Sequence, residues 1–316
     1  MRVLNIVTNH DSQFFRTQVD RLRDRGVEAD VLAVPGHNEA NSVHGDGDRT
    51  RSVTDYLRFL PGVLQRSFGQ YDLLHANYGL TAPAAVAQPN LPTVLSLWGS
   101  DLMGSAGWFV RPFAARVDEV VVMSDRMAAE LDRDCHVVPH GVDLSLFQPE
   151  PQQRARDRLG WAHDPTIVLF PYPPSRDVKN YPRAERIVAA TRDRVDGEVD
   201  LRIPSGVPHS EMPTYMNAAD ALLVTSKREG SPNTVKEALA CNCPVVSTPV
   251  GDVPERLDGV RLSAVGGTDE ELVEGLVAAL EAGANSNGRE AVRDLGLDAT
   301  AERLHGVYER VLDGQS

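Results

Sequence analysis

Residues 229–255 of the 316-residue chain read EGSPNTVKEALACNCPVVSTPVGDVPE, and this stretch is the most informative about the fold. Ser231 has a side chain suited to capping the start of a helix, and Pro232 is suited to the first helical position. The pattern predicts a helix of about two turns over residues 233–240, which ends at the turn formed by Asn242 and the residues after it.

Two glutamates lie on either side of the start of this helix. Glu229 precedes the helix and Glu237 lies about two turns along it, so a rise of 1.5 Å per residue separates them by roughly 12 Å. The first-turn amides between them have no partner within the helix and attract phosphate. Two carboxylates with an anion-binding patch between them suit a nucleoside diphosphate sugar, which offers a ribose diol, a diphosphate and sugar hydroxyls.

The residues around the pair make the prediction specific, because two glutamates at this spacing occur by chance in many proteins. The apolar run 221–224 leads through Thr225 and Ser226 into the turn, and a second apolar run follows the helix from Val245. This order predicts a strand, a turn, a helix and a second strand. Open α/β sheets bind ligands at the carboxyl ends of such strands.

The rest of the chain alternates in the same way between short apolar runs and amphipathic helices. Strands are predicted at residues 3–7, 29–34, 73–75, 93–97, 119–123 and 166–170, and helices at 12–25, 53–67, 124–133 and 299–312. Residues 38–51, rich in Asp, Gly and His, are predicted to form a mobile loop. The alternation predicts parallel sheets covered by helices, and the length suffices for two domains.

Composition excludes several classes of function. A net charge of −13 argues against a general binder of nucleic acid or of anionic membranes. Three cysteines fit neither a disulfide framework nor a zinc site, and no apolar run approaches the length of a membrane span. The N-terminus lacks a signal-peptide pattern, so we expect a reducing cytoplasm. Arg outnumbers Lys 29 to 3 and Asp outnumbers Glu 27 to 18, a bias typical of a salt-adapted cytosol.

Several motifs in order resemble those of the retaining glycosyltransferases of family 4, which have the GT-B fold. The stretch quoted above resembles the family's E-x7-E region. Four further motifs resemble its other conserved segments: DLLHANYG at 72–79, SLWGSD at 96–101, PHGVD at 139–143 and RDVKN at 176–180. The resemblance covers nearly the whole chain and is strongest to the subgroup that makes teichuronic-acid-type and related cell-surface polysaccharides.

The resemblance implies a GT-B architecture, in which two Rossmann-like βα domains face each other across a cleft. Residues 1–147 would form an N-terminal acceptor-binding domain, and residues 148–298 a C-terminal nucleotide-sugar donor domain. Residues 299–316 would form a helix that packs back on the N-terminal domain. The two domains would hinge near Gly141 as the cleft closes.

The resemblance also implies roles for individual residues. Glu237 would accept hydrogen bonds from the ribose, and Glu229 would hold hydroxyls of the donor sugar. Lys179 and Arg176 would stabilise the negative charge of the departing diphosphate, without a metal ion or a cofactor. Four further residues would place backbone near the donor: Val207 at the nucleobase, and Gly230, Ser231 and Asn233 at the sugar and diphosphate. The alternatives are an exposed helical glutamate for Glu237 and a solvated surface for the basic pair.

The N-terminal half departs from the family pattern at Trp98, where relatives often carry histidine. Asp101 is then the best polar candidate for a sugar contact, unless it caps the segment that follows it. His75 and His140 lie at motif positions, and either is also compatible with a buried imidazole whose nitrogens are paired.

A helix rich in large apolar residues is predicted within residues 49–68. Its apolar residues are Tyr56, Leu57, Phe59, Leu60, Val63, Leu64 and Phe68, and it is edged by Arg49, Arg51, Arg58 and Arg66. One interpretation is an amphipathic helix that faces the core. The other is a helix that meets a lipid-linked acceptor at the membrane surface.

These patterns predict transfer of a hexose-like sugar, with retention, from a nucleotide-sugar donor to a glycan or lipid-linked acceptor in cell-surface polysaccharide synthesis. We expect a cytoplasmic protein with possible peripheral contact at the inner face of the membrane, and no nucleic-acid partner. A nucleotide-sugar epimerase of GT-B fold and a non-catalytic nucleotide-sugar-binding subunit are the alternatives. The sequence leaves open the base, the sugar, the acceptor, the linkage and the oligomeric state.

Overall fold

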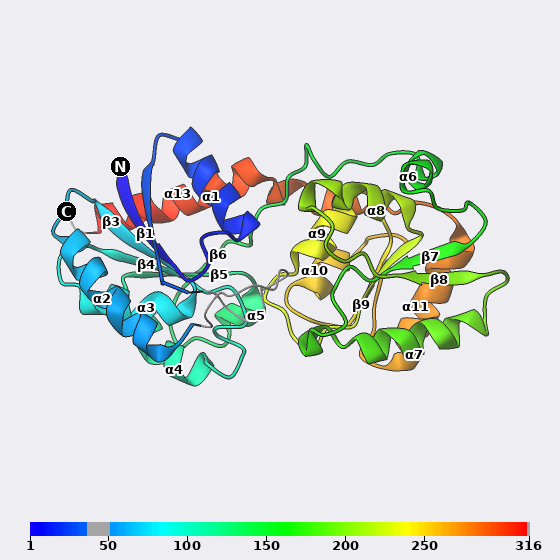
Figure 1. The fold of residues 1–316 in the computed structure, drawn as a ribbon, viewed down its shortest axis with the longest axis horizontal. Helices are drawn as coiled ribbons and strands as arrows, with labels where there is room; N and C mark the ends of the chain where they lie inside the picture. Colours follow the sequence, from blue (N-terminus) through cyan, green and yellow to red (C-terminus); the bar gives the residue numbers. More distant parts are fainter. Residues whose placement is uncertain (37–50, 315–316) are drawn as a thin grey trace. The chain divides into compact units, whose positions relative to one another are not determined.

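The computed structural model describes residues 1–36 and 51–314, which form two compact α/β units (Figure 1). Unit 1 comprises Met1–Gly141 together with Leu297–Ser316, and unit 2 comprises Val142–Gly296. Apart from Arg51, the loop predicted at residues 38–51 lies outside the described residues. Each unit is built around a parallel sheet, so the predicted α/β class is confirmed.

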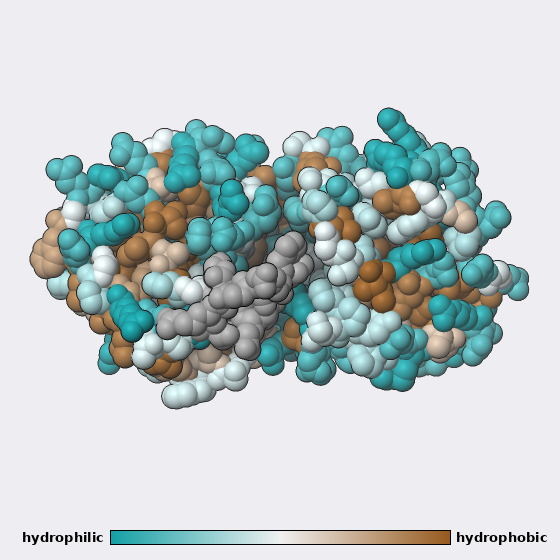
Figure 2. All heavy atoms as spheres, in the orientation of Figure 1, coloured by the Kyte–Doolittle hydropathy of each residue, from teal (hydrophilic) through white to brown (hydrophobic). Residues whose placement is uncertain are grey.

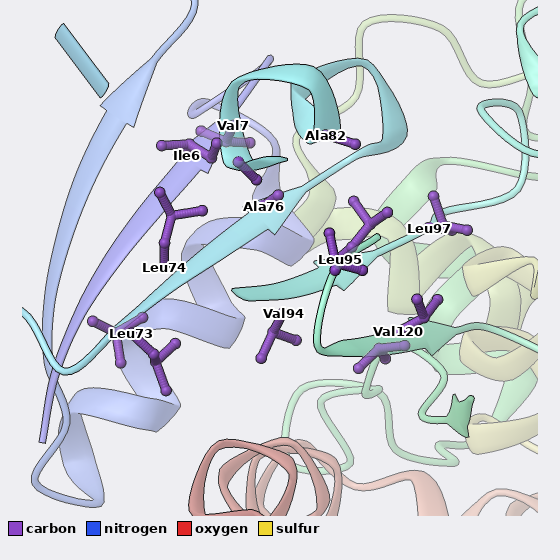
Figure 3. Packing of buried hydrophobic residues seen from close by; sticks show 14 of the residues in the cluster. Ile6, Val7, Leu73, Leu74, Ala76, Ala82, Val94, Leu95, Leu97 and Val120 are labelled. Carbon is purple, nitrogen blue, oxygen red and sulfur yellow. The ribbon is translucent and has the colours of Figure 1, made fainter. Parts of the chain in front are cut away.

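Unit 1 contains a parallel sheet of six strands in the order β2-β1-β3-β4-β5-β6. The strands are β1 (Arg2–Val7), β2 (Glu28–Ala33), β3 (Leu73–Asn77), β4 (Thr93–Ser96), β5 (Glu119–Val122) and β6 (His136–Val137). Aliphatic side chains from neighbouring strands pack together in its core, as Figure 3 shows for Ile6, Leu74 and Leu95. Such burial requires apolar runs of the kind from which the strands were predicted.

The helices of unit 1 cover this sheet. They are α1 (Gln13–Asp24), α2 (Val53–Ser67), α3 (Ala82–Ala87), α4 (Gly107–Ala114), α5 (Asp125–Ala128) and α13 (Leu297–Asp313), with the short 3-10 helix η2 (Gly79–Thr81). The helix predicted at residues 124–133 is therefore shorter than expected. The Arg133 guanidinium donates hydrogen bonds to the backbone carbonyls of Ala114, Val117 and Asp118, which hold the chain in a turn.

The C-terminal helix α13 is part of unit 1. It packs beside α1 and buries Leu304, Val307 and Tyr308 in the core of the unit. Nδ1 of His75 lies 2.7 Å from the Tyr308 hydroxyl, and Nε2 lies 2.7 Å from Oγ of Ser96. Burial lowers the pKa of His75 to about 3, so the ring is neutral at physiological pH. His75 is thus a buried imidazole with both nitrogens paired.

Unit 2 contains a parallel sheet of five strands in the order β11-β10-β9-β7-β8. The strands are β7 (Thr166–Leu169), β8 (Val199–Arg202), β9 (Ala221–Val224), β10 (Val245–Ser247) and β11 (Ala264–Val265). The helices are α6 (Gln152–Leu159), α7 (Tyr181–Arg192), α8 (Met212–Ala218), α9 (Asn233–Ala240), α10 (Val253–Leu257), α11 (Asp269–Ala282) and α12 (Gly288–Ala291). Three 3-10 helices complete the unit: η3 (Asp177–Lys179), η4 (His209–Glu211) and η5 (Arg293–Leu295).

Both faces of this second sheet are buried. Leu222 and Val224 of β9 pack with α8, α9 and α10 on one face, while Ala221 and Leu223 pack with α7 and α11 on the other. Because successive side chains of a strand point to opposite faces, a strand buried on both faces must be apolar throughout. In the central strand β9, which reads ALLV, polar side chains are therefore absent and follow only after the strand ends.

We expect Tyr308→Phe to lower the free energy of unfolding by about 1–3 kcal/mol, because it leaves a buried nitrogen of His75 without its partner. Equilibrium unfolding in urea measures this loss. Glu302→Gln, an exposed change on the same helix, is the control and should change stability by less than about 0.5 kcal/mol. Equal stability of the two variants would show that the hydrogen bond between His75 and α13 contributes nothing.

Candidate functional site

Polar side chains gather in unit 2 where β7 and β9 end. The loop after β7 carries Tyr172 and Lys179, and the loop after β9 carries Glu229 and leads into α9, on which Glu237 lies. Strands β7 and β9 are neighbours in the sheet. Because the carboxyl ends of parallel strands lie at one edge, the two loops meet there, where α/β sheets bind ligands.

Helix α9 begins at Asn233 and ends at Ala240, as predicted, but the predicted cap was wrong. Pro232 is the N-cap residue, and no side chain caps the helix. The Ser231 hydroxyl instead donates a 2.8 Å hydrogen bond to Oδ2 of Asp252, which ties the turn to the start of α10. The first turn of α9 therefore offers amides that the side chain of its N-cap residue leaves uncapped.

Glycines let two loops approach each other at this turn. Gly251 has a φ of +56°, a conformation that favours glycine. A Cβ atom added to it would lie 2.4 Å from the backbone carbonyl oxygen of Gly230. The backbone of Gly230 thus lies against the loop after β10, which fixes the turn that carries Glu229.

Lys179 and Glu229 form a buried ion pair. Nζ of Lys179 lies 2.5 Å from Oε1 of Glu229 and 3.9 Å from the centre of the Tyr172 ring. The side chains are only 7% and 17% exposed. Desolvation lowers the pKa of Lys179, and the carboxylate of Glu229 opposes this shift. Each charge therefore depends on the other, because a single buried charge is costly.

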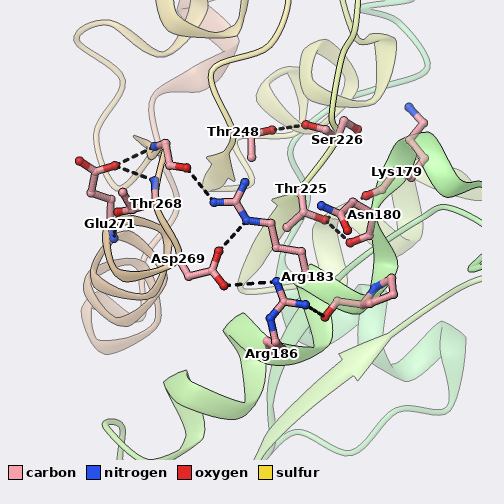
Figure 4. Close-up of polar contacts among 12 residues, drawn as sticks. Lys179, Asn180, Arg183, Arg186, Thr225, Ser226, Thr248, Thr268, Asp269 and Glu271 are labelled. Atoms are coloured by element: carbon pink, nitrogen blue, oxygen red, sulfur yellow. Dashed lines mark hydrogen bonds and ion pairs between the residues drawn. The ribbon is translucent and has the colours of Figure 1, made fainter.

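The backbone around Lys179 is held by the neighbouring strand. The hydroxyl of Thr225, directly after β9, donates to the backbone carbonyls of Lys179 and Asn180 at 3.0 and 3.1 Å (Figure 4). Arg176, in the same loop, has an exposed side chain. Within the described part of the chain, no carboxylate forms an ion pair with Arg176. This arginine therefore remains available to an anion.

Glu237 is paired as well. Its Oε1 lies 2.7 Å from Nε2 of His209 in η4, and the His209 ring packs at 5.3 Å from the ring of Phe147. The Glu237 side chain is only 12% exposed, so the interpretation as an exposed helical glutamate is wrong. The hydrogen bond to Glu237 is the main cause that raises the pKa of His209. The sequence singled out Val207, which is half-buried, but missed His209 two residues later.

Three buried polar atoms in the loops after β7 and β9 and at the start of α9 have no hydrogen-bond partner among the described residues. They are the hydroxyl oxygen of Tyr172, after β7, Oγ of Ser226, directly after β9, and Oδ1 of Asn233, at the start of α9. A buried polar atom without a partner costs about 1–3 kcal/mol, so most such atoms in proteins are paired. Three of them in these loops and beside an uncapped helix indicate a position for a polar ligand.

Asp101 of unit 1 is a loop clamp. It is fully buried, and its carboxylate accepts hydrogen bonds from the backbone N–H groups of Gly79, Trp98, Gly99 and Leu102 at 2.7–3.1 Å. Desolvation raises its pKa, and these backbone hydrogen bonds oppose the rise. The structure thus supports the capping interpretation, because no oxygen of Asp101 is left to contact a sugar.

Trp98, which stands where relatives often carry histidine, packs among aromatic rings. Its ring centre lies 4.6 Å from that of Phe14 and 5.6 Å from those of Tyr78 and His140. His140 is itself buried against Phe14. This part of unit 1 is therefore an aromatic cluster.

Among the described residues, no group of three or more His, Cys, Asp or Glu side chains is placed to hold a metal ion. The same residues contain no helix that is long and apolar enough to cross a membrane.

Two family models match consecutive parts of the chain. The model described as Glycosyltransferase Family 4 matches residues 12–146, and the one described as Glycosyl transferases group 1 matches residues 181–282. Among curated proteins, the D-inositol 3-phosphate glycosyltransferase 1 of Catenulispora acidiphila is 27% identical over 81% of this chain and 76% of its own. The putative teichuronic acid biosynthesis glycosyltransferase TuaC of Bacillus subtilis is also 27% identical, over 58% of this chain and 54% of its own.

Solved structures share the fold. The sucrose-phosphate synthase of Thermosynechococcus elongatus superposes with a TM-score of 0.76 at 16% identity, over 99% of this chain and 100% of that one. HepE of Anabaena in complex with UDP-glucose has a TM-score of 0.67 at 17% identity, over 98% of this chain and 100% of that one. The GT-B fold expected from the sequence is thereby confirmed.

We expect the contribution of His209 to stability to depend on pH. Pairing with Glu237 raises the pKa of His209 above its ordinary value of 6.5, so the protonated ring stabilises the folded chain. This contribution is complete below about pH 6.5 and is lost as the pH rises through the folded pKa. His209→Gln keeps a donor but no charge, so it should be less stable than the parent chain at low pH.

Thermal unfolding of both proteins between pH 5.5 and 8.5 measures the effect. The histidine is 42% exposed, so the difference should stay below about 1 kcal/mol and vanish at the alkaline end. A difference that stays constant over this range would contradict the pairing of a charged His209 with Glu237.

We expect Lys179→Met to lower the free energy of unfolding by about 3–5 kcal/mol, because it leaves the buried carboxylate of Glu229 without its cation. The double variant Lys179→Met/Glu229→Gln removes both charges and should recover most of this loss. Urea unfolding of the single and double variants measures the coupling. Additive losses would contradict a coupled pair.

Proposed function

Because this chain belongs to the family 4 glycosyltransferases and has their GT-B fold, we propose that it transfers a hexose, with retention, from a nucleotide-sugar donor to a glycan or lipid-linked acceptor. The donor binds in unit 2 at the carboxyl ends of β7 and β9. Unit 1 serves the acceptor. The product belongs to a cell-surface polysaccharide or related glycan, and the reaction takes place on the cytoplasmic side.

The observation that carries this proposal is the arrangement of the two glutamates. Glu229 and Glu237 are largely buried, Glu229 is paired with the ammonium group of Lys179 and Glu237 with the ring of His209, and the uncapped first turn of α9 lies between them in the chain. A nucleoside diphosphate sugar has the complementary groups in the same order, with sugar hydroxyls, a diphosphate and a ribose diol. Hydroxyl donors suit the carboxylates, and the diphosphate suits the helix amides and Lys179.

In the proposed complex, groups of the donor bind to side chains that pair with each other in the free protein. The sugar hydroxyls donate to Glu229, and the diphosphate offers Lys179 a second anion. The ribose diol donates to Glu237, whose Oε1 is held by His209. The backbone of Gly230, Ser231 and Asn233 lies beside the sugar and diphosphate, and the unpaired Oδ1 of Asn233 accepts a hydroxyl hydrogen bond. Val207 places its backbone against the nucleobase.

The reaction breaks the bond between the anomeric carbon and the oxygen of the terminal phosphate. The electron pair of this bond goes to the diphosphate, and Lys179 and Arg176 stabilise the negative charge that develops there. The acceptor hydroxyl attacks the same face of the sugar, and its proton passes to the departing phosphate oxygen. The products are the glycoside, with its configuration retained, and a nucleoside diphosphate.

One observation favours a second candidate function, a non-catalytic nucleotide-sugar-binding subunit. The histidine expected in unit 1 is replaced by Trp98, and Asp101 is fully occupied by backbone N–H groups. Turnover separates the two functions. Slow hydrolysis of the bound donor to free sugar and nucleoside diphosphate, lost in Lys179→Ala, supports a catalyst, whereas tight binding without release of nucleotide supports the subunit.

We expect Glu237→Ala to weaken donor binding tenfold or more, because hydrogen bonds to a charged group contribute about 1.5–3 kcal/mol each. A thermal-shift screen of UDP-, GDP- and ADP-sugars first identifies the donor that stabilises the parent chain. The same titration is then repeated with the variant. Glu255→Ala, an exposed glutamate on α10, is the matched control and should bind like the parent. Equal binding by Glu237→Ala and the parent would contradict the assigned site.

A further inference from the structure

Helix α2 of unit 1 carries apolar side chains on two opposite sides. Phe59 and Val63 are buried in the core at 4% and 0% exposure. Leu60 is partly buried against the same core, and a second stripe at helical spacing on the other side of the helix consists of Val53, Leu57, Leu64 and Phe68. Three of its members, Val53, Leu57 and Phe68, are 77%, 64% and 75% exposed. A helix that only packs on a core carries polar residues on its outer side. Packing on the core therefore accounts for the buried apolar residues of α2 but not for the exposed ones.

Helix α4 extends the exposed apolar surface. Trp108 is 79% exposed and Phe109 is 38% exposed, and their rings are in contact. Helices α2, α3 and α4 border a groove of about 340 Å³, and Figure 2 shows hydrophobic surface over α2 and α3. The described residues that line the groove are all apolar or aromatic: Val53, Tyr56, Leu57, Phe59, Leu60, Leu80, Pro83, Ala84 and Phe109. We call this surface the α2–α4 face.

The described segments that carry the α2–α4 face are basic, although the chain as a whole carries −13. The segments 51–68 and 80–116 contain five arginines: Arg51, Arg58, Arg66, Arg111 and Arg116. Their only acidic residues, Asp55 and Asp101, are buried and accept backbone N–H groups. Glu130, from outside these segments, pairs with Arg111. Arg51 donates to the backbone carbonyls of Thr8, Val34, Pro35 and Gly36, so the exposed Arg58, Arg66 and Arg116 supply the positive charge on the segments that carry the α2–α4 face.

We propose that the α2–α4 face docks on an anionic phospholipid surface. Exposed Trp and Phe enter the boundary between headgroups and acyl chains, where the amphipathic tryptophan ring is favoured. The exposed arginines extend their long side chains to lipid phosphates while their stems cover apolar surface. The negative charge of the rest of the chain is repelled by the same lipids, so docking is confined to this face.

The chemistry of the face favours a membrane over a folded protein partner. The chain has no described helix that could span a bilayer, so the contact is peripheral. Such binding needs both apolar insertion and attraction to anionic headgroups, because either alone gives weak, reversible attachment. The α2–α4 face offers both within one unit, and it shares no residue with the donor site in unit 2.

Co-flotation with phospholipid vesicles tests the proposal, at a salt concentration where circular dichroism shows the folded chain. We expect binding to vesicles of phosphatidylcholine with 30% phosphatidylglycerol, and binding at least tenfold weaker to pure phosphatidylcholine. The double variant Trp108→Ser/Phe109→Ser should lose tenfold or more in affinity. Arg58→Gln/Arg116→Gln should lose affinity for the anionic vesicles only. Val265→Ser, a partly exposed apolar residue of unit 2, is the matched control.

Three outcomes would overturn the proposal. One is a folded parent chain that floats with neither vesicle, and another is an aromatic variant that binds as the parent does. The third is a parent chain that self-associates while the aromatic variant is monomeric, which would assign the face to a second copy. The donor-induced thermal shift should be the same in the parent and the aromatic variant, so failure of docking and failure of the proposed donor site are distinguishable.

Discussion

The constraint on which this structure depends is the burial of parallel sheets on both faces. Successive side chains of β9 enter two separate apolar clusters, so the strand itself has no place for a polar group. The polar side chains of the candidate site therefore lie after the strands, in the loops at the carboxyl end of the sheet. There, Lys179 from one loop meets Glu229 from the next, although 50 residues separate them in the chain.

Both glutamates of the candidate site already have partners before any ligand binds. The ammonium group of Lys179 pairs with the carboxylate of Glu229, and the ring of His209 pairs with that of Glu237. Desolvation lowers the pKa of the buried Lys179, and its pairing with Glu229 opposes this shift. A donor that binds as we propose would exchange these partners for its own groups, so its binding would not bury an unpaired carboxylate. Among the described residues, the site still has unpaired groups: the exposed guanidinium of Arg176, which has no ion pair, the hydroxyls of Tyr172 and Ser226, and the amide oxygen of Asn233. These small deficits are ones that a polar ligand removes.

Unit 1 uses a similar sheet for different chemistry. Its motif residues turn inward: Asp101 clamps a loop, His75 links β3 to the C-terminal helix, and Trp98 packs among rings. Its exposed features are instead apolar, on the outer stripe of α2 and at Trp108 of α4. Because the polar motif side chains of unit 1 bond to groups of the unit itself, this unit is suited to bind a partner through shape and apolar contact. The polar unit 2 is suited to hold a charged small molecule.

The sequence by itself predicted most of the described strands but fewer than half of the described α-helices, because apolar runs and helical periodicity are local properties that show clearly only where the pattern is strong. It also identified the stretch from Glu229 to Glu237, where α9 begins and ends at the predicted residues. It failed where the answer lay in contacts between distant residues. The Ser231 hydroxyl bonds Asp252 instead of capping α9, Arg133 shortens α5, and backbone amides from two loops occupy Asp101. Only the tertiary structure pairs His209 with Glu237 and Lys179 with Glu229, because hydrogen bonds and desolvation depend on which loops the sheet brings together.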